Sequence, residues 1–436
     1  MCSRARLAHV MAGEEKIPAV IVGGTGPGTL GMVRSLGRAS VPIILLDEDA
    51  LSPAAHSVYV RKVVSSQSSG VLMVKNLLAL SASIGPSILF LNSDDAALTV
   101  SEYREDLERN YKFQLPSHSC LTSLMDKTNF QRLAEEYGFP VPRSVTVRHT
   151  ADLSRLTGLR FPCIVKPRRG TANYAKALFE RGYKVVSPEQ AESICHRILA
   201  VVPGLVVQEW VEGPDSDLFF CLQYRATDGT TVCSFTGRKL SIWPPDVGVT
   251  ASCTAAPEER PILQRLTEAF FERMSFVGMG GIEFKRDLRT GEFLMIEPTV
   301  GRVDGQEEVA TLHGANIPLA AYMHEIGLSS PILTEKEHTP VIWRDFFSHR
   351  KSTAARGSHS GSMKPGTKIC DAYWRSDDPI PWLFHLLDFS EQSLRRSWRQ
   401  VRKKLRKSGQ AHASMAASTH IPDDGASVST ATHKLD

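Results

Sequence analysis

The sequence lacks the features of several protein classes. Its eight cysteines include no CxxC pair and no short metal-binding spacing, so neither a disulfide framework nor a cysteine-ligated metal site is predicted. There is no run of 18 apolar residues, and a membrane-spanning helix is therefore not expected. The first residues lack the apolar stretch of a signal peptide. Together these absences predict a cytoplasmic protein.

An excess of charge of one sign is also absent from most of the chain. The formal net charge is +4 over 436 residues, and eight basic residues lie between Arg395 and Lys407. The remainder is nearly neutral, which argues against nucleic acid as a partner of the whole protein. The proportions of 42% hydrophobic and 22% charged residues are those of a globular protein. A chain of this length is expected to form two or three lobes.

The N-terminal part alternates between strand and helix patterns. After a start over 1–16 that is predicted to be disordered, Ala19 to Val22 is an apolar run followed by the turn GGTGPG. Residues 29–38 have helical character, and Val41 to Leu46 is a second apolar run. This alternation predicts an α/β lobe, a doubly wound parallel sheet, over 17–115.

A mixed pattern of helices and hairpins follows over 116–330. The segment DKTNFQRLAEEYG is predicted to be a helix from Asp126 to Gly138, and FPCIVKP a strand that ends at a proline. Another helix is expected over 258–275. Two pairs of β segments are joined by short turns, DLFFCLQYRA with TTVCSFTGRKL and GGIEFKRD with EFLMIEP. This order predicts an α+β domain.

The C-terminal part gives a weaker pattern. We expect a C-terminal extension over 331–390, with a loop or linker over 350–367, where Ser, Gly, Lys and His are frequent. A basic amphipathic helix is predicted over 391–407. The small and polar residues of 408–436 predict a disordered tail.

Two glutamates and two lysines stand out in the α+β segment. Glu283 and Glu297 lie in apolar arms of one predicted hairpin, where a carboxylate is costly to bury unless it is paired or bound to metal. Mg²⁺ prefers such oxygen ligands. Lys127 opens a predicted helix and Lys166 ends an apolar strand, and either lysine alone is typical of a protein surface.

The order of these segments resembles the ATP-grasp superfamily. The series, from roughly residue 115 to 327, is a DK-helix, GFPVP, IVKP, VVQEWVEG, GIEF and IEPTVGR. The preceding α/β lobe resembles the domain that usually precedes an ATP-grasp domain. The resemblance covers about three quarters of the chain and implies ATP and Mg²⁺ as cofactors, with Mn²⁺ as an alternative ion.

The resemblance implies a role for each matching position. Lys127 and Lys166 would contact the phosphates of ATP. Glu283, Glu297 and the hydroxyl of Thr299 would hold the metal. The adenine would lie along a strand from Gln208, with Glu209 and the backbone of Trp210 and Val211 at its edge. Asp217, with Glu212 as a rival, would bind the ribose, and Arg302 would neutralise the transferring phosphoryl group.

Three departures from the superfamily pattern leave room for a degenerate member. Thr299 stands where an asparagine is common, and the assignment of Arg302 assumes a small insertion. The loop after Lys166, RRGTANYAKA, contains one glycine, although phosphate-covering loops are generally richer in glycine. Arg168 and Arg169 would have to compensate with their charge.

Within the superfamily the chain is similar to carboxylate–amine ligases of the D-aspartate ligase type. The pieces that carry this likeness include RSLGRASVPIILLD, GRKLSIWPPDVG and DAYWRSDDPIP. It implies that the chain phosphorylates a carboxylate and transfers the acyl group to an amine, with a small-molecule pair as substrates. Arg238, Lys239, Gln306 and His313 are candidates to face the carboxylate, and a homodimer is expected from the superfamily.

A dehydrogenase is the main alternative enzyme. Gly26, Gly28 and Gly31 fit G-x-G-x-x-G between a strand and a helix, and Asp47 follows about 20 residues later. This pattern is typical of NAD-binding domains. A glycine-rich turn also serves any close strand-to-helix connection, so the motif alone is weak.

A non-enzymatic function is the other alternative. Leu394, Trp398, Val401 and Leu405 recur at helical spacing among the basic residues of 391–407, and the apolar segment PWLFHLLDF precedes them. Such a helix suits an anionic membrane surface, with nucleic acid as a second partner for the charges. A helix that packs on the core with a solvated basic face is an equal alternative.

Overall fold

The computed structural model describes residues 16–24, 26–169, 181–328, 340–356 and 366–390. Four predictions lie wholly or largely outside these ranges: the disordered start, the loop from Gly170, the basic helix at 391–407 and the tail. The chain divides into one compact unit that ends at Phe384 and a second that begins at His385. All three β-sheets belong to the first unit.

The first sheet is parallel, as the alternating sequence predicted. Its strands are β1 (Ala19–Val22), β2 (Ile43–Asp47), β3 (Val60–Ser65), β4 (Ser87–Leu91) and β5 (Tyr111–Lys112), in the order β3-β2-β1-β4-β5. The central strands are completely buried, which explains their continuous apolar runs.

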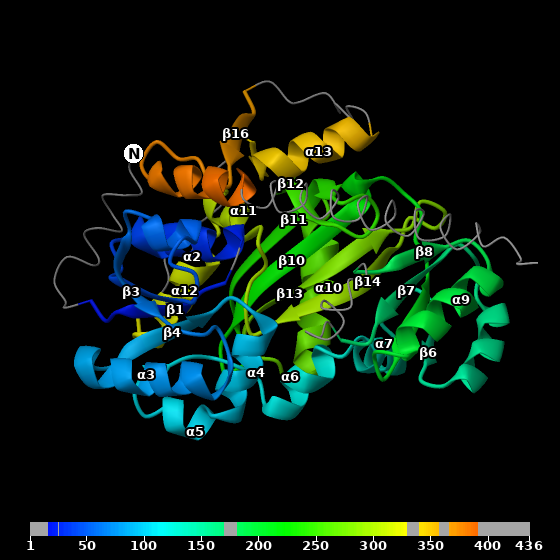
Figure 1. The fold of residues 1–436 in the computed structure, drawn as a ribbon, viewed down its shortest axis with the longest axis horizontal. Helices are drawn as coiled ribbons and strands as arrows, with labels where there is room; N and C mark the ends of the chain where they lie inside the picture. Colours follow the sequence, from blue (N-terminus) through cyan, green and yellow to red (C-terminus); the bar gives the residue numbers. More distant parts are fainter. Residues whose placement is uncertain (1–15, 25, 170–180, 329–339, 357–365, 391–436) are drawn as a thin grey trace, which may run out of the picture. The chain divides into compact units, whose positions relative to one another are not determined.

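Helices cover both faces of this sheet. The helix α2 (Pro27–Gly37) packs on one face, while α3 (Gly70–Ile84) and α4 (Asp94–Glu102) pack on the other, as Figure 1 shows. Short helices α5 (Arg104–Leu107) and α6 (His118–Leu124) follow. The doubly wound fold predicted for this lobe is confirmed.

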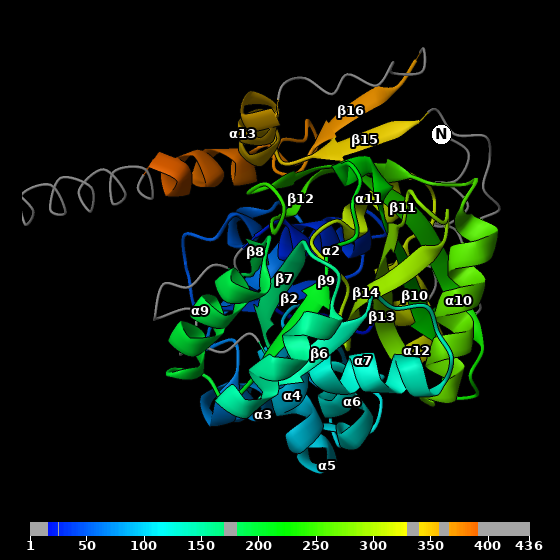
Figure 2. The same ribbon diagram turned by 90° about the vertical axis from the view of Figure 1, so that its right-hand side faces the viewer.

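The second sheet is antiparallel and has four strands. These are β6 (Ser144–Val147), β7 (Cys163–Pro167), β8 (Tyr183–Val185) and β9 (Leu205–Glu209), in the order β6-β9-β7-β8. The helix α9 (Pro188–Leu199) and the 3₁₀ segment η2 (Thr150–Gly158) bury one face in an apolar core, and Figure 2 shows α9 beside the strands. The opposite face carries Lys166 and Gln208, because side chains alternate along a strand.

The third sheet has seven strands, in the order β14-β13-β10-β11-β12-β15-β16. Its strands are β10 (Leu218–Arg225), β11 (Thr231–Trp243), β12 (Val249–Ala255), β13 (Gly278–Arg286), β14 (Phe293–Val300), β15 (Val341–Arg344) and β16 (Lys368–Asp371). Both predicted hairpins are present as β10–β11 and β13–β14. The last two strands come from the predicted C-terminal extension. The domain limits themselves stay a prediction.

Both faces of the seven-stranded sheet are covered along much of their length. The helix α10 (Arg260–Arg273) packs on the face that carries Phe219 and Ile282. The face that carries Phe220 and Leu222 packs on α2 and on α12 (Ile317–Glu325). Predicted helices at 126–138 and 258–275 correspond to α7 (Lys127–Glu136) and α10.

Part of the expected linker at 350–367 is helical, which corrects that prediction. The helix α13 (Phe346–Arg356) covers residues 350–356, and residues 357–365 are outside the described ranges. The polar composition of this segment did not predict a helix, because contacts with other parts of the chain stabilise it. The His349 ring lies 3.1 Å from the Ser241 hydroxyl, and Arg356 forms ion pairs with Asp215 and Asp246.

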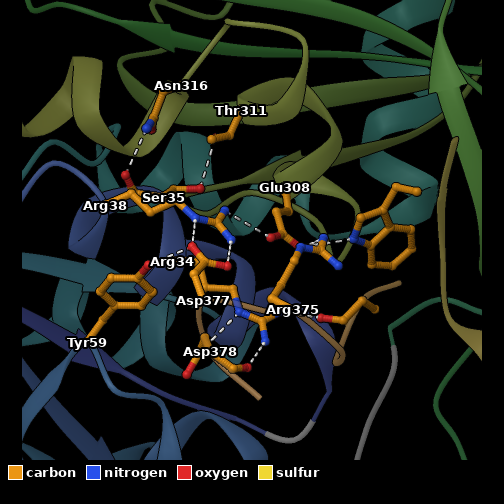
Figure 3. A network of polar contacts seen from close by, with 12 residues as sticks. Arg34, Ser35, Arg38, Tyr59, Glu308, Thr311, Asn316, Arg375, Asp377 and Asp378 are labelled. Atoms are coloured by element: carbon orange, nitrogen blue, oxygen red, sulfur yellow. Dashed lines mark hydrogen bonds and ion pairs between the residues drawn. The ribbon is translucent and has the colours of Figure 1, made fainter. Parts of the chain in front are cut away.

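A buried polar network attaches the segment after β16 to the first lobe (Figure 3). Arg34 of α2 and Asp378 are both inaccessible to solvent, and the Arg34 Nε lies 2.9 Å from the Asp378 Oδ2. Nearby, Arg375 and the Trp343 indole donate to Glu308 of helix α11 (Glu307–Leu312). This network fixes the C-terminal segment against α2 and α11.

No helix within the described ranges combines the length and apolar character that crossing a bilayer requires. The seven cysteines within those ranges are all free thiols. Burial raises the pKa of several of them, including the pKa of Cys163 to about 12, which is the behaviour of structural rather than reactive thiols.

Candidate functional site

The hairpin β13–β14 brings two carboxylates together. Glu283 and Glu297 are directly opposite each other in the antiparallel ladder, so both side chains point from the same face of the sheet. The Glu297 side chain is 48% exposed and that of Glu283 is 24% exposed. Two like charges at opposed positions repel each other, so this pair requires compensating cations.

Two lysines compensate the glutamates. Lys127, the first residue of α7, donates a hydrogen bond from Nζ to Glu297 Oε1. Lys239, on β11, donates from Nζ to Glu283 Oε2. Asp126 caps α7 by accepting from the backbone N–H groups at its start, which fixes the point at which Lys127 leaves the helix.

Lys166 belongs to the same electrostatic cluster, although it comes from the four-stranded sheet. Burial lowers its pKa, and the positive charge of Lys127 adds to this effect while Glu297 and Glu283 oppose it. Burial alone would raise the pKa of Glu297, but Lys127 and Lys166 lower it to about 2. The residues predicted for phosphate and metal binding are therefore close enough to interact strongly.

The metal-binding potential of the cluster comes from oxygen atoms. Within the described ranges no group of three or more His, Cys, Asp or Glu side chains is arranged to hold a metal ion. Glu283 and Glu297 are nevertheless an adjacent pair, and Mg²⁺ typically takes one or two carboxylates with the remaining ligands from phosphate and water. Thr299 follows Glu297 by two residues on β14, so its hydroxyl is on the same face.

Arg302 lies just beyond the end of β14. Its Nε is 2.6 Å from Asp94 Oδ1, and its Nη1 is 3.0 Å from Asp304 Oδ1. Although burial acts to lower it, the two carboxylates raise the pKa of Arg302 above its ordinary value. Arg302 also contributes to the low pKa of Glu297, so it is part of the cluster.

The predicted adenine strand ends β9, and its side chains have mixed orientations. Gln208 is opposite Ile164 in the ladder and so shares the face of Lys166. Glu209 points to the other face, where its carboxylate accepts 2.9 Å bonds from the backbone and guanidinium of Arg160. The Glu209 side chain is thus engaged with Arg160, and a contact of Glu209 with the adenine stays a prediction.

The backbone N–H groups of the two residues after β9 differ in their hydrogen bonding. The Trp210 N–H donates to the Pro162 carbonyl at 2.9 Å. The Val211 N–H has no acceptor in the part of the chain that the structure describes. Lys184, which shares the Lys166 face of the sheet through its partner Ile164, places its Nζ 4.5 Å from the centre of the Trp210 ring.

The two candidates for a ribose contact differ in their accessibility. Asp217 is only 3% exposed at its side chain and accepts hydrogen bonds from Arg286. Glu212 has a 58% exposed side chain and lies 3.9 Å from Lys184 Nζ. The structure therefore favours the rival Glu212, since a nucleotide would have to displace a buried ion pair to reach Asp217.

Of the four residues predicted to face the carboxylate substrate, one lies in the cluster and three do not. Lys239 points into the cluster, and its neighbour Arg238 points to the opposite face of β11. His313 is buried and engages the Val309 carbonyl and the Val341 N–H. Gln306 is buried and donates to Asp304 at 3.4 Å. Gln306 is thus linked to the cluster through Asp304, which also accepts a hydrogen bond from Arg302.

Arg168 and Arg169, which we expected to compensate for the missing glycines with their charge, both have a carboxylate partner in this structure. Both guanidinium groups pair with Asp126, and Arg169 also donates to the Thr122 carbonyl at 2.8 Å. They therefore support the start of α7, and through it Lys127.

The dinucleotide fingerprint lacks an available acid. Asp47 is buried, and its carboxylate accepts hydrogen bonds from the Ser52 hydroxyl at 2.7 Å and the Asp49 N–H at 3.0 Å. A Cβ at Gly28 would lie 3.2 Å from the Gly305 Cα. Gly28 thus serves close packing between the first lobe and the loop after β14, and Gly26 serves the turn before α2 with a φ of +114°.

Comparisons with known proteins agree with this geometry. No family model matches the chain. A curated relative, D-aspartate ligase from Enterococcus faecium, is 23% identical over 320 residues, which are 70% of this chain and 75% of the relative.

Solved structures share the fold. Carboxyaminoimidazole ribonucleotide synthase from Aspergillus clavatus, complexed with ATP, gives a TM-score of 0.59 at 15% identity, covering 81% of this chain and 92% of that one. The biotin carboxylase domain of 2-oxoglutarate carboxylase from Hydrogenobacter thermophilus, with MgADP and bicarbonate, gives 0.58 at 12% identity, covering 74% and 72%.

Proposed function

We propose, from the ATP-grasp fold that this chain has, that the protein is an ATP-dependent ligase that activates a carboxylate as an acyl-phosphate and transfers the acyl group to an amine, with ADP and phosphate as products. The observation that carries the proposal is the cluster formed by Lys127, Lys166, Lys239, Glu283 and Glu297. Lys127 and Lys166 suit a triphosphate, and the paired carboxylates suit its metal ion.

The residues fit a magnesium nucleotide. Glu283 and Glu297, with the Thr299 hydroxyl, would hold Mg²⁺ or Mn²⁺. The ion would neutralise charge on the phosphate oxygens when bound. Lys127 would then exchange its bond to Glu297 for phosphate oxygens, and Lys166 would contact phosphate oxygens beside it. The low pKa of Glu297 keeps that side chain ionised for its role as a metal ligand.

The adenine would lie against the Lys166 face of the four-stranded sheet. The Val211 N–H, which has no acceptor among the described residues, would be a donor at the adenine edge, and the backbone carbonyl of Glu209 would be the corresponding acceptor. Trp210 would contribute through its carbonyl and ring, because its own N–H is already bonded to Pro162. Glu212 is proposed for the ribose hydroxyls ahead of Asp217.

Each step of the reaction has a candidate group. A carboxylate oxygen of the substrate attacks the γ-phosphorus, and the bond to the ADP oxygen breaks while Lys166 and Arg302 offset the charge. The amine nitrogen then attacks the acyl carbon, the bond to phosphate breaks, and the nitrogen loses a proton. Lys239 is placed to orient the carboxylate. Catalysis is by positioning and electrostatic stabilisation.

The curated relative suggests the substrate class. Since that relative is named for D-aspartate, we propose an amino-acid carboxylate as the group that is activated and an amine as the acceptor. A cytoplasmic location and a homodimer are proposed with it; one of the similar structures is itself described as a dimer. Contact of 391–407 with an anionic membrane is a separate proposal, tested by liposome sedimentation of the full chain against a chain that ends near Asp378.

Calorimetry tests nucleotide binding directly. ATP is titrated into the protein with and without Mg²⁺, using wild type, Glu297→Ala and Lys166→Ala. Glu292→Ala is the matched control, since Glu292 is an exposed carboxylate in the turn of the same hairpin. Magnesium-dependent binding that is lost in the first two variants and kept in the third supports the proposal.

The reaction itself is tested by trapping. The protein is incubated with MgATP, D-aspartate and hydroxylamine, which converts an acyl-phosphate to a hydroxamate, and other amino acids and dicarboxylates follow. ATP binding without ADP or hydroxamate from any carboxylate would favour a degenerate member. Absence of ATP binding, together with tight binding of NAD, would overturn the ligase proposal.

A further inference from the structure

The position of Arg302 is determined by a helix of the first lobe. Asp94, the first residue of α4, accepts a hydrogen bond from Arg302 Nε at 2.6 Å across 208 positions of sequence. Charge-assisted bonds of this length are among the stronger side-chain interactions. The α4 helix begins firmly, because Ser93 caps it by accepting from the Ala96 N–H at 3.1 Å.

The same helix also packs against the backbone next to Arg302. Gly301 has a φ of +72°, a conformation that favours glycine. A Cβ there would lie 3.0 Å from Ala97 Cβ and 2.8 Å from Leu115 Cδ2. Ala97 follows Asp94 by three residues and so lies on the same side of α4. The helix therefore holds both the main chain and the side chain at this point.

Asp304 completes the support of the guanidinium. Its Oδ1 accepts from Arg302 Nη1 at 3.0 Å, so the two carboxylates hold two different nitrogens of the planar group, Nε and Nη1. In the part of the chain that is described, Arg302 Nη2 has no protein acceptor. Arg302 Nη1 also donates to the Val303 carbonyl at 3.4 Å, so Nη2 carries the N–H groups that remain for a ligand.

We propose that Asp94 is a positioning residue for phosphoryl transfer: with Asp304, it orients Arg302 so that the free N–H edge of the guanidinium faces the γ-phosphoryl group. This inference rests on the ligase function proposed above. It makes the first lobe part of the catalytic apparatus, because α4 supplies the group that sets the direction of Arg302.

The expected kinetic signature is a loss of kcat at nearly constant affinity for ATP. Arg302 would act on the transferring group, whereas Lys127 and Lys166 would hold the nucleotide. Asp94→Asn keeps the shape of the side chain but weakens its bond to Arg302, so kcat is expected to fall about ten- to one-hundredfold, with KM for ATP changed less than about twofold.

Asp95→Asn is the matched control. Asp95 is the next residue in the first turn of α4 and is exposed, so its replacement removes the same charge from the same helix end. Any general effect on the helix dipole or on net charge would appear in both variants. Only Asp94→Asn is expected to lower kcat.

A double variant separates positioning from a structural effect. If Asp94 acts through Arg302, then adding Asp94→Asn to Arg302→Ala is expected to cause no further loss of kcat, although each single variant is impaired. The hydroxamate assay with MgATP and the carboxylate found active with wild type provides the rates. Unfolding midpoints of all variants are measured beside them.

Two results would overturn the inference while leaving the ligase function intact. One is an active wild type in which Asp94→Asn and Asp95→Asn have equal kcat. The other is a further loss of kcat when Asp94→Asn is combined with Arg302→Ala. A wild type that forms neither ADP nor hydroxamate with any carboxylate would instead count against the proposed function.

Discussion

Replacing Asp378 with alanine is expected to destabilise the first compact unit strongly. Asp378 and Arg34 are both fully inaccessible, and the Asp378 carboxylate also accepts from the Ser57 hydroxyl and the Val58 N–H, each at 2.9 Å. Figure 3 shows this pair within its network. Removing the carboxylate leaves the Arg34 guanidinium buried without its hydrogen-bonded counter-charge.

The size of the expected loss in unfolding free energy follows from the burial of Arg34. Removing one partner of a buried ion pair typically costs about 3–5 kcal/mol. Arg34 would keep bonds to backbone carbonyls, including 2.6 Å to Ala372 and 2.7 Å to Tyr373, so we expect the lower half of that range, about 3–4 kcal/mol. In urea, with a slope of about 3 kcal/mol/M, the unfolding midpoint would fall by about 1 M.

Asp377→Ala provides the comparison. Asp377 is adjacent in sequence, pairs with Arg38 at 3.0 Å and is 38% exposed, so its loss should cost less than about 1 kcal/mol. Urea unfolding followed by tryptophan fluorescence measures both variants. Equal midpoints for Asp377→Ala and Asp378→Ala would refute the reasoning from burial.

An Arg34→Met background tests the cause. With the Arg34 cation removed, Asp378→Ala should cost clearly less in that background than in wild type, which is a coupling between the two sites. Additive losses would show that the missing counter-charge is not the source of the instability, and that packing around the segment after β16 decides it.

Two further predictions concern the nucleotide site and the pH dependence of stability. Glu212→Gln is expected to weaken ATP binding about fivefold, a loss of roughly 1 kcal/mol typical of one hydrogen bond. Asp217→Asn, which loosens the pair with Arg286, should lower the urea midpoint while the folded protein keeps its ATP affinity. If calorimetry instead shows weaker ATP binding for Asp217→Asn and unchanged binding for Glu212→Gln, Asp217 is the residue that binds the ribose. Glu307 is fully buried between the hydroxyls of Ser35 and Thr311, and burial raises its pKa to about 7. Its contribution is therefore present at low pH and is lost as pH rises from about 4.5 through 7, because the native state binds more protons than the unfolded chain over that window. Glu307→Gln should remove this loss, gaining on the order of 3 kcal/mol relative to wild type at pH 8 and little at pH 4, and urea midpoints that differ equally at both pH values would contradict it.

The local structure around the site was predictable from the sequence. The hairpin with Glu283 and Glu297 needs only two apolar β segments and a short turn, and the pairing of its arms determines that the two glutamates meet. The helix that starts at Lys127 has its own cap in Asp126. Such features depend on neighbours in sequence, so the order of motifs was enough to predict both the fold and the cluster.

Which partner each charged side chain takes was decided by the tertiary structure. Lys239 and Arg238 are adjacent and alike in sequence, but the strand places only Lys239 beside Glu283. Glu209 pairs with Arg160, and Asp217 pairs with Arg286. No sequence pattern predicts either pair. The dinucleotide fingerprint was misleading for the same reason, because Asp47 is bonded to its own turn.

The largest contribution of tertiary structure lies between segments far apart in the chain. Asp94 reaches Arg302 across 208 positions, and Arg34 reaches Asp378 across 344. A single sequence records the periodicity of each element, which local backbone geometry dictates. It does not record which surfaces meet when elements pack, since that depends on the burial and pairing of all the elements together. In this protein that packing determines which residues hold Arg302.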